Sequence, residues 1–97
     1  MQVAEVINRL LENMVKFLDE VPCAQPLVKE YKERVLSLTP EQQTITIKTM
    51  LSPFQFPDDA LVFILTQAKV DEDKLSSEHR EKIKKYVGAL MDISKDA

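Results

Sequence analysis

The chain is poor in the residues that tight turns require. Its 97 residues include one glycine, Gly88, and only two asparagines. Two-residue hairpin turns need positive backbone φ angles, which glycine and asparagine adopt most readily. A β-meander or β-barrel is therefore not expected. Five prolines interrupt the sequence instead, which is typical of helices joined by short breaks.

Cysteine and long apolar runs are also scarce. Cys23 is the only cysteine, so no internal disulfide can form and an intracellular, cytoplasmic location is expected. The longest apolar run, residues 60–65, is far shorter than the roughly 20 residues of a membrane-spanning helix. Glu5 and Arg9 interrupt the N-terminal region, which therefore lacks the pattern of a signal peptide. The composition, 44% apolar and 30% charged, predicts a soluble globular chain of one domain, residues 1–97.

The residues that carry catalysis and metal binding are too few for the common sites. His79 is the only histidine, and a nucleophilic triad would require folding alone to bring it beside an acid and either Cys23 or a distant serine. A zinc site needs several Cys and His residues at short spacings, and only these two exist. A single glycine excludes a glycine-rich phosphate loop. The acidic residues 71–73 resemble the start of a calcium loop, but Ser76 and Lys82 stand where such a loop needs glycine and glutamate. We expect no enzyme activity, no cofactor and no metal.

The N-terminal region carries the clearest helical pattern, and it predicts an amphipathic helix over residues 2–21. Its apolar side consists of Val3, Val6, Ile7, Leu10, Leu11, Met14, Phe17, Leu18 and Val21. Six of these residues also follow the alternating spacing of four and three that marks a coiled-coil seam. Because fewer than three heptads are present, we favour a helix packed within its own chain over a seam between two chains.

Four further helices are predicted, over residues 26–38, 40–51, 58–68 and 76–94. Residues 39–42 form a capping box, which is a specific helix start, although the threonines that follow favour strands. The helix over 58–68 is apolar on nearly all sides, a pattern typical of a buried helix. The sequence thus predicts an all-α fold: a compact bundle of about five helices around a central helix, 58–68, packed by the first, second and last.

Several apolar residues remain after each helix has been given one buried side. Phe54 and Phe56 fall on the same side of an extended connector, where they either plug the core or form a docking element. Gly88 lies inside the last helix, where glycine costs about 1 kcal/mol relative to alanine, and this suggests close approach of another helix, from this chain or a second molecule. Surplus apolar surface tends to mark interfaces. The candidate interface residues are Leu36, Ile45, Phe54, Phe56, Val62, Phe63 and Gly88.

These observations predict a non-catalytic protein–protein interaction module, either a homo-oligomer such as a homodimer or a small adaptor that binds a helical partner. The alternative is a nucleic-acid-binding regulator that uses the basic cluster of the last helix, with Arg80, Lys84 and Lys85 as contacts. The formal net charge of −3, spread evenly along the chain, disfavours this alternative. Glu78 and Glu81 are interspersed among these basic residues, so an ordinary charged helix surface is the favoured explanation of the cluster.

Overall fold

The computed structural model describes residues 2–96, which form five α-helices and two short 3₁₀-helices and contain no strand. The α-helices are α1 (Val3–Asp19), α2 (Gln25–Arg34), α3 (Pro40–Leu51), α4 (Pro57–Gln67) and α5 (Ser77–Ser94). The 3₁₀-helices are η1 (Pro22–Ala24) and η2 (Glu72–Lys74). The predicted all-α bundle of five helices is confirmed.

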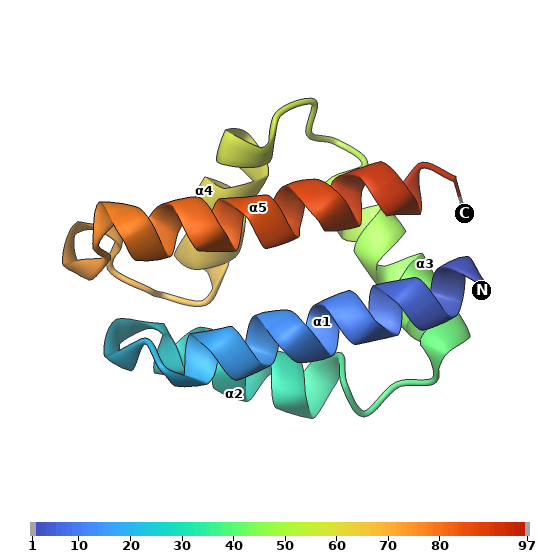
Figure 1. Cartoon of the computed structure of the whole chain (residues 1–97), viewed down its shortest axis with the longest axis horizontal. Coiled ribbons are helices and arrows are strands. Elements are labelled where there is room, and N and C mark those ends of the chain that lie inside the picture. The colour runs from blue at the N-terminus through green and yellow to red at the C-terminus, as the bar shows by residue number, and fades with distance from the viewer. Residues whose placement is uncertain (1, 97) are drawn as a thin grey trace.

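The two longest helices, α1 and α5, run antiparallel on the face shown in Figure 1, with α2 against α1 and α4 against α5. Helix α3 packs against both α1 and α5 near the two chain ends. The predicted centre was wrong: α1 and α5 each pack against three other α-helices, whereas α4, which covers most of the segment 58–68, packs chiefly on α5. The broad apolar side of α1 can cover three neighbours, whereas α4 turns Val62 and Phe63 to solvent.

Local sequence explains where α3 begins and where α2 ends. The hydroxyl of Thr39 accepts a hydrogen bond from the Gln42 amide at 3.2 Å, and the Gln42 side chain accepts one from the Thr39 amide at 3.3 Å. This capping box fixes the start of α3 at Pro40, as predicted. Helix α2 ends at Arg34 and not at residue 38, because the chain turns at residues 35–37, where the Val35 and Leu36 amides both donate to the Tyr31 carbonyl. Thr39, which is held extended before Pro40, separates this turn from α3.

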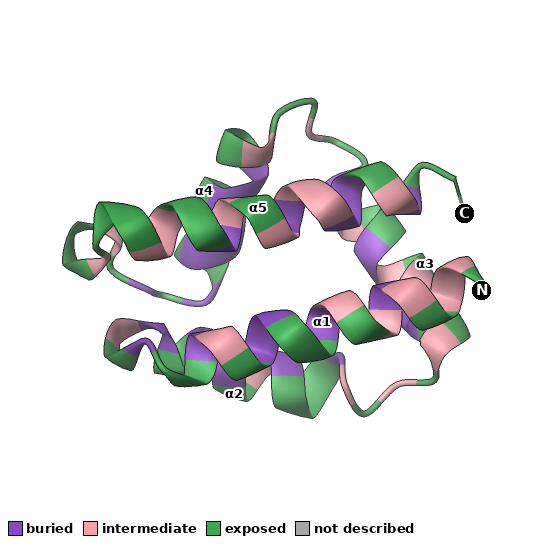
Figure 2. Cartoon of the chain, in the orientation of Figure 1, coloured by how far each residue is buried: buried purple, intermediate pink, exposed green. Residues whose placement is uncertain are grey.

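The core is formed by the sides of the helices that face one another (Figure 2). Its largest fully buried apolar side chains are Ile7, Leu11, Met14, Leu18, Val21, Leu27, Ile47, Leu61, Leu65, Ile83 and Leu90. One polar side chain, Gln43 of α3, is also fully buried. Its amide group accepts a hydrogen bond from Asn8 Nδ2 at 2.9 Å and donates one to the Val35 carbonyl at 3.2 Å. Gln43 therefore links α3 to α1 and to the end of α2.

Tyr31 of α2 is buried in the core, and its hydroxyl has no hydrogen-bond partner among the described residues 2–96. Burial, together with the nearby charge of Glu30, raises the pKa of the Tyr31 hydroxyl, because the phenolate would lose its solvation. A buried hydroxyl without a partner costs about 1–3 kcal/mol. The unpaired hydroxyl of Tyr31 therefore lowers the stability of the folded state.

We expect Tyr31→Phe to raise the free energy of unfolding by up to about 1 kcal/mol at pH 7, because it removes the unpaired hydroxyl and keeps the ring. The substitution also changes the response to alkali. In the unfolded chain Tyr31 loses its proton near its ordinary pKa of about 10, while the folded chain keeps that proton, so stability falls as pH rises above this value. Urea unfolding at pH 7 and above pH 10 should show a smaller alkaline loss in the variant. A substantial loss of stability in Tyr31→Phe at pH 7 would contradict this account.

Candidate functional site

Large apolar side chains gather on the outer side of α4. The exposed fractions are 62% for Phe56, 41% for Val62 and 36% for Phe63. Phe56 occupies the N-cap position directly before α4, with an extended backbone, and Phe63 lies seven residues further along the chain, about two helical turns into α4. The Phe54 ring packs on Phe63, with ring centroids 5.2 Å apart. We call Phe54, Phe56, Val62 and Phe63 the aromatic surface.

The two phenylalanines of the connector do not share one environment. Phe54 is half-buried and packs against the core, whereas Phe56 projects into solvent. The expectation that both rings plug the core therefore holds for Phe54 alone. The chain turns sharply between Leu51 and Pro57, so the alternation of an extended strand does not apply there.

The other candidate interface residues lie apart from the aromatic surface. Leu36 is half-buried against the core, and Ile45 is 66% exposed on α3. A methyl group placed on Gly88 would lie 3.4 Å from Pro57 Cγ at the start of α4. This is an ordinary van der Waals distance, so Gly88 faces the start of α4 within the same chain, but the contact does not require glycine.

Two residues of the basic cluster are paired within the chain. Arg80 bridges Asp58 and Glu72, with N–O distances of 3.2 and 3.3 Å, and Lys84 Nζ lies 3.2 Å from the second oxygen of Asp58. Hydrogen bonds from Lys84 and Arg80 lower the pKa of the Asp58 carboxyl. Of the three predicted nucleic-acid contacts, only Lys85 has no carboxylate partner within residues 2–96. Phosphate groups would have to compete with these carboxylates, and this reduces the support for the nucleic-acid alternative.

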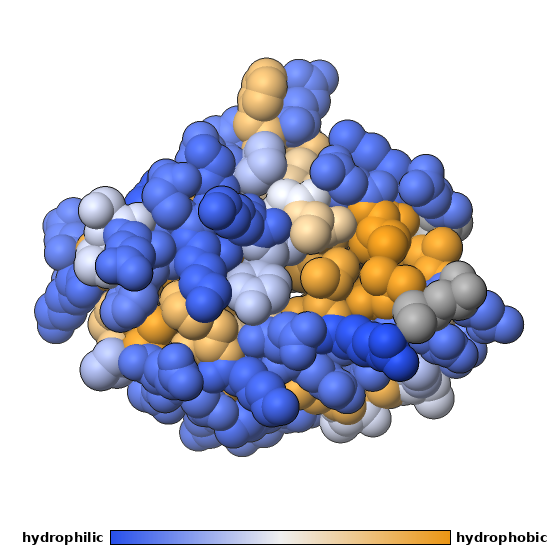
Figure 3. Space-filling model, viewed as in Figure 1, coloured by the Kyte–Doolittle hydropathy of each residue, from blue (hydrophilic) through white to orange (hydrophobic). Residues whose placement is uncertain are grey.

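A groove between α1 and α5 is a second apolar feature, and sequence reasoning did not identify it. Two joined depressions, of about 320 and about 350 Å³, share Leu10 and Ala89 in their lining. Figure 3 shows apolar surface exposed between the two helices. We call this feature the α1–α5 groove. Its complete lining is Leu10, Lys82, Lys85, Tyr86, Ala89, Asp92, Ile93 and Asp96.

The remaining reactive side chains are not assembled into a site. Among residues 2–96, no group of three or more His, Cys, Asp or Glu side chains is arranged to hold a metal ion. The ring of His79 packs edge-on against Phe17 at 5.8 Å, and Cys23 is half-buried. None of the described helices is long and apolar enough to cross a membrane.

Comparisons with protein-family models, with curated proteins and with solved structures each found no match to this chain.

Proposed function

We propose that this protein is a non-catalytic protein-interaction module, an adaptor that binds a helical partner through the aromatic surface. The observation that carries the proposal is the exposure of Phe56 at the start of α4 and of Val62 and Phe63 within it, with Phe54 packed on Phe63. Exposed apolar residues scattered singly are ordinary, but a contiguous group tends to mark a binding site. Full burial of one phenylalanine side chain contributes about 1.5–3 kcal/mol. A partner that covers two of these rings therefore gains substantial binding energy.

The shape and charge of the aromatic surface favour an amphipathic helix as the partner. Side chains two turns apart form a ridge that packs against the side chains of a second helix. Asp59 lies between Phe56 and Phe63 along α4 and is exposed. Within residues 2–96 its carboxylate has no ion-pair partner, unlike that of Asp58. A lysine or arginine beside the apolar side of the partner helix would complement this charge.

Phe56→Ser is the variant that tests the proposal. Serine is among the best N-cap residues, so the substitution should leave α4 at least as stable while it removes the most exposed ring. We expect affinity capture from a lysate of the source cells to retain a specific protein with the wild-type chain. Retention should fall about tenfold or more with Phe56→Ser, which corresponds to about 1.4 kcal/mol.

Ile45→Ser is the matched control, because Ile45 is 66% exposed and Phe56 is 62% exposed, yet Ile45 lies on α3 and outside the aromatic surface. Its captured proteins should equal those of the wild type. The proposed function would be contradicted if the wild type, Phe56→Ser and Ile45→Ser captured the same proteins equally, or if the wild type captured no protein. Circular dichroism of each variant establishes that the fold is unchanged.

A further inference from the structure

The α1–α5 groove is lined by apolar side chains that the chain itself leaves partly uncovered. Leu10, Tyr86, Ala89 and Ile93 are all half-buried along it. On α1, Ile7 and Met14 belong to the seam-like spacing and are buried, whereas Leu10 and Phe17, from the same spacing, are only half-buried. The buried residues of the seam pattern thus belong to the core, Leu10 lines the groove, and Phe17 packs against the groove residues Tyr86 and Lys82.

The charges along the α1–α5 groove are arranged symmetrically about Ala89. Lys82 and Asp96 lie seven residues before and after it. Lys85 precedes Ala89 by four residues, and Asp92 follows it by three. One end of the groove is therefore basic and the other acidic, at equal distances from a small central residue.

We propose that the α1–α5 groove is the contact surface of a homodimer, in which the α5 helices of two copies cross antiparallel beside Ala89. A two-fold interface places the same patch on both copies, so the patch must be complementary to itself. In an antiparallel pair centred on Ala89, Lys82 faces Asp96 of the second copy, and Lys85 lies near the second copy's Asp92. A parallel pair would instead set like charges against each other.

The charged groups of the groove are available for such contacts. Within residues 2–96, Lys85, Asp92 and Asp96 take part in no ion pair. The Lys82 ammonium stands over the Phe17 ring, 4.5 Å from its centroid, and has no carboxylate beside it. Arg80 is different, because it is already held by Asp58 and Glu72. The basic residues of α5 thus divide into a group paired within the chain and a group directed to the groove.

The size of the surface suits a dimer contact. The α1–α5 groove opens on the broadest face of the molecule, which is the face seen in Figures 1 and 3 and measures 35 by 27 Å. That face can contain the roughly 800 Å² per partner of a standard interface. The small side chain of Ala89 allows the two helices to approach closely at the axis. This surface is distinct from the aromatic surface, so either proposal can fail without the other.

Sedimentation equilibrium of charge-swapped chains tests the homodimer. We expect the wild type to form dimers at concentrations between about 1 and 200 µM. Lys82→Glu/Lys85→Glu and Asp92→Lys/Asp96→Lys should each weaken the homodimer about tenfold or more. An equimolar mixture of the two variants should form a heterodimer, because every facing pair is then again of opposite sign. Lys29→Glu/Lys74→Glu, which changes the net charge equally at distant exposed positions, should dimerise like the wild type.

Ala89→Arg is a second test of the homodimer. A long charged side chain at the two-fold axis should prevent the two copies from approaching and leave only monomer. A wild-type chain that stays monomeric at the highest concentration would overturn the homodimer, as would charge-swapped variants that do not associate when mixed. If the groove instead binds a helix of another protein, the wild-type chain would stay monomeric. Phe56→Ser should dimerise normally, so this test and the test of the adaptor function give separate answers.

Discussion

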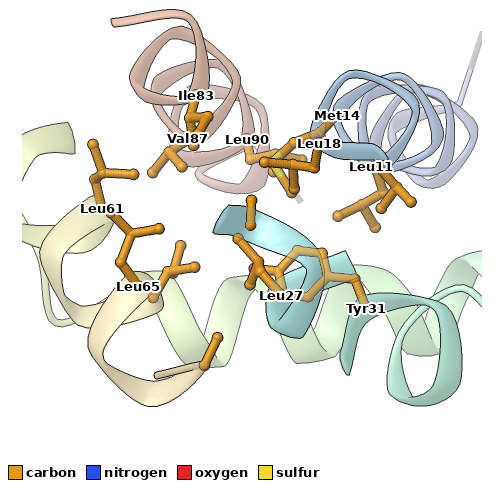
Figure 4. Packing of buried hydrophobic residues seen from close by; sticks show 14 of the residues in the cluster. Leu11, Met14, Leu18, Leu27, Tyr31, Leu61, Leu65, Ile83, Val87 and Leu90 are labelled. Carbon is orange, nitrogen blue, oxygen red and sulfur yellow. The ribbon is translucent and has the colours of Figure 1, made fainter. Parts of the chain in front are cut away.

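Leu65→Ala is expected to lower the free energy of unfolding by about 2–5 kcal/mol, because it removes a buried side chain and leaves a cavity. Leu65 is only 1% exposed. Figure 4 shows Leu61 and Leu65 directed from α4 into the interior of the bundle, toward the side of α5 that carries Ile83 and Val87. Urea unfolding followed by circular dichroism measures the loss.

Val62→Ala on the same helix is the control for Leu65→Ala. Val62 is 41% exposed, and alanine has the higher helix propensity, so the change in stability should stay within about 0.5 kcal/mol. If Leu65→Ala costs less than about 1 kcal/mol, the inner side of α4 lies at the edge of the core and not within it. That result would also weaken the interpretation that the opposite side of α4, which carries Val62 and Phe63, is a free binding surface.

The helices could be predicted from the sequence because their signals are local. The apolar spacing of α1 and the capping box before α3 depend on residues only a few positions apart. The prediction that the segment 58–68 is the central helix was wrong because it, too, depended on local residues alone. Its apolar run shows how much surface can be buried, but not which neighbours are available, and α4 in fact buries one side and leaves Val62 and Phe63 exposed.

The candidate sites likewise include one that could be predicted from the sequence and one that could not. Phe63 could be named beforehand, because either it or Val62 remained after the helix had been given one buried side, and Phe56 could be named from its place in the connector beside Phe54. The α1–α5 groove could not, because Leu10 and Tyr86 belong to apolar sides that were expected to be covered. Only the packing of α1 beside α5 decides which edge of each apolar side stays open. The burial of Gln43 had no local signal either, because its partner Asn8 is 35 residues away.

Gln43→Ala is expected to lower the free energy of unfolding by about 2–4 kcal/mol, a loss close to that of a large core side chain. The substitution leaves the Val35 carbonyl and the Asn8 amide without their partner and opens a cavity at a fully buried position. Because Gln43 connects α3 to α1 and to the end of α2, both connections weaken together. Urea unfolding at pH 7 measures the loss, and Gln55→Ala, at an exposed position, should change stability by less than about 0.5 kcal/mol.

A double-mutant cycle separates the hydrogen bond from the cavity. Asn8→Ala removes the donor to Gln43 and should itself cost about 1 kcal/mol, since Asn8 is only half-buried. When both residues are alanine, the total loss should be smaller than the sum of the two single losses by at least about 0.5 kcal/mol, the coupling typical of groups in direct contact. Losses that simply add would show that Gln43 stabilises the fold through its packing and the Val35 carbonyl, without help from Asn8.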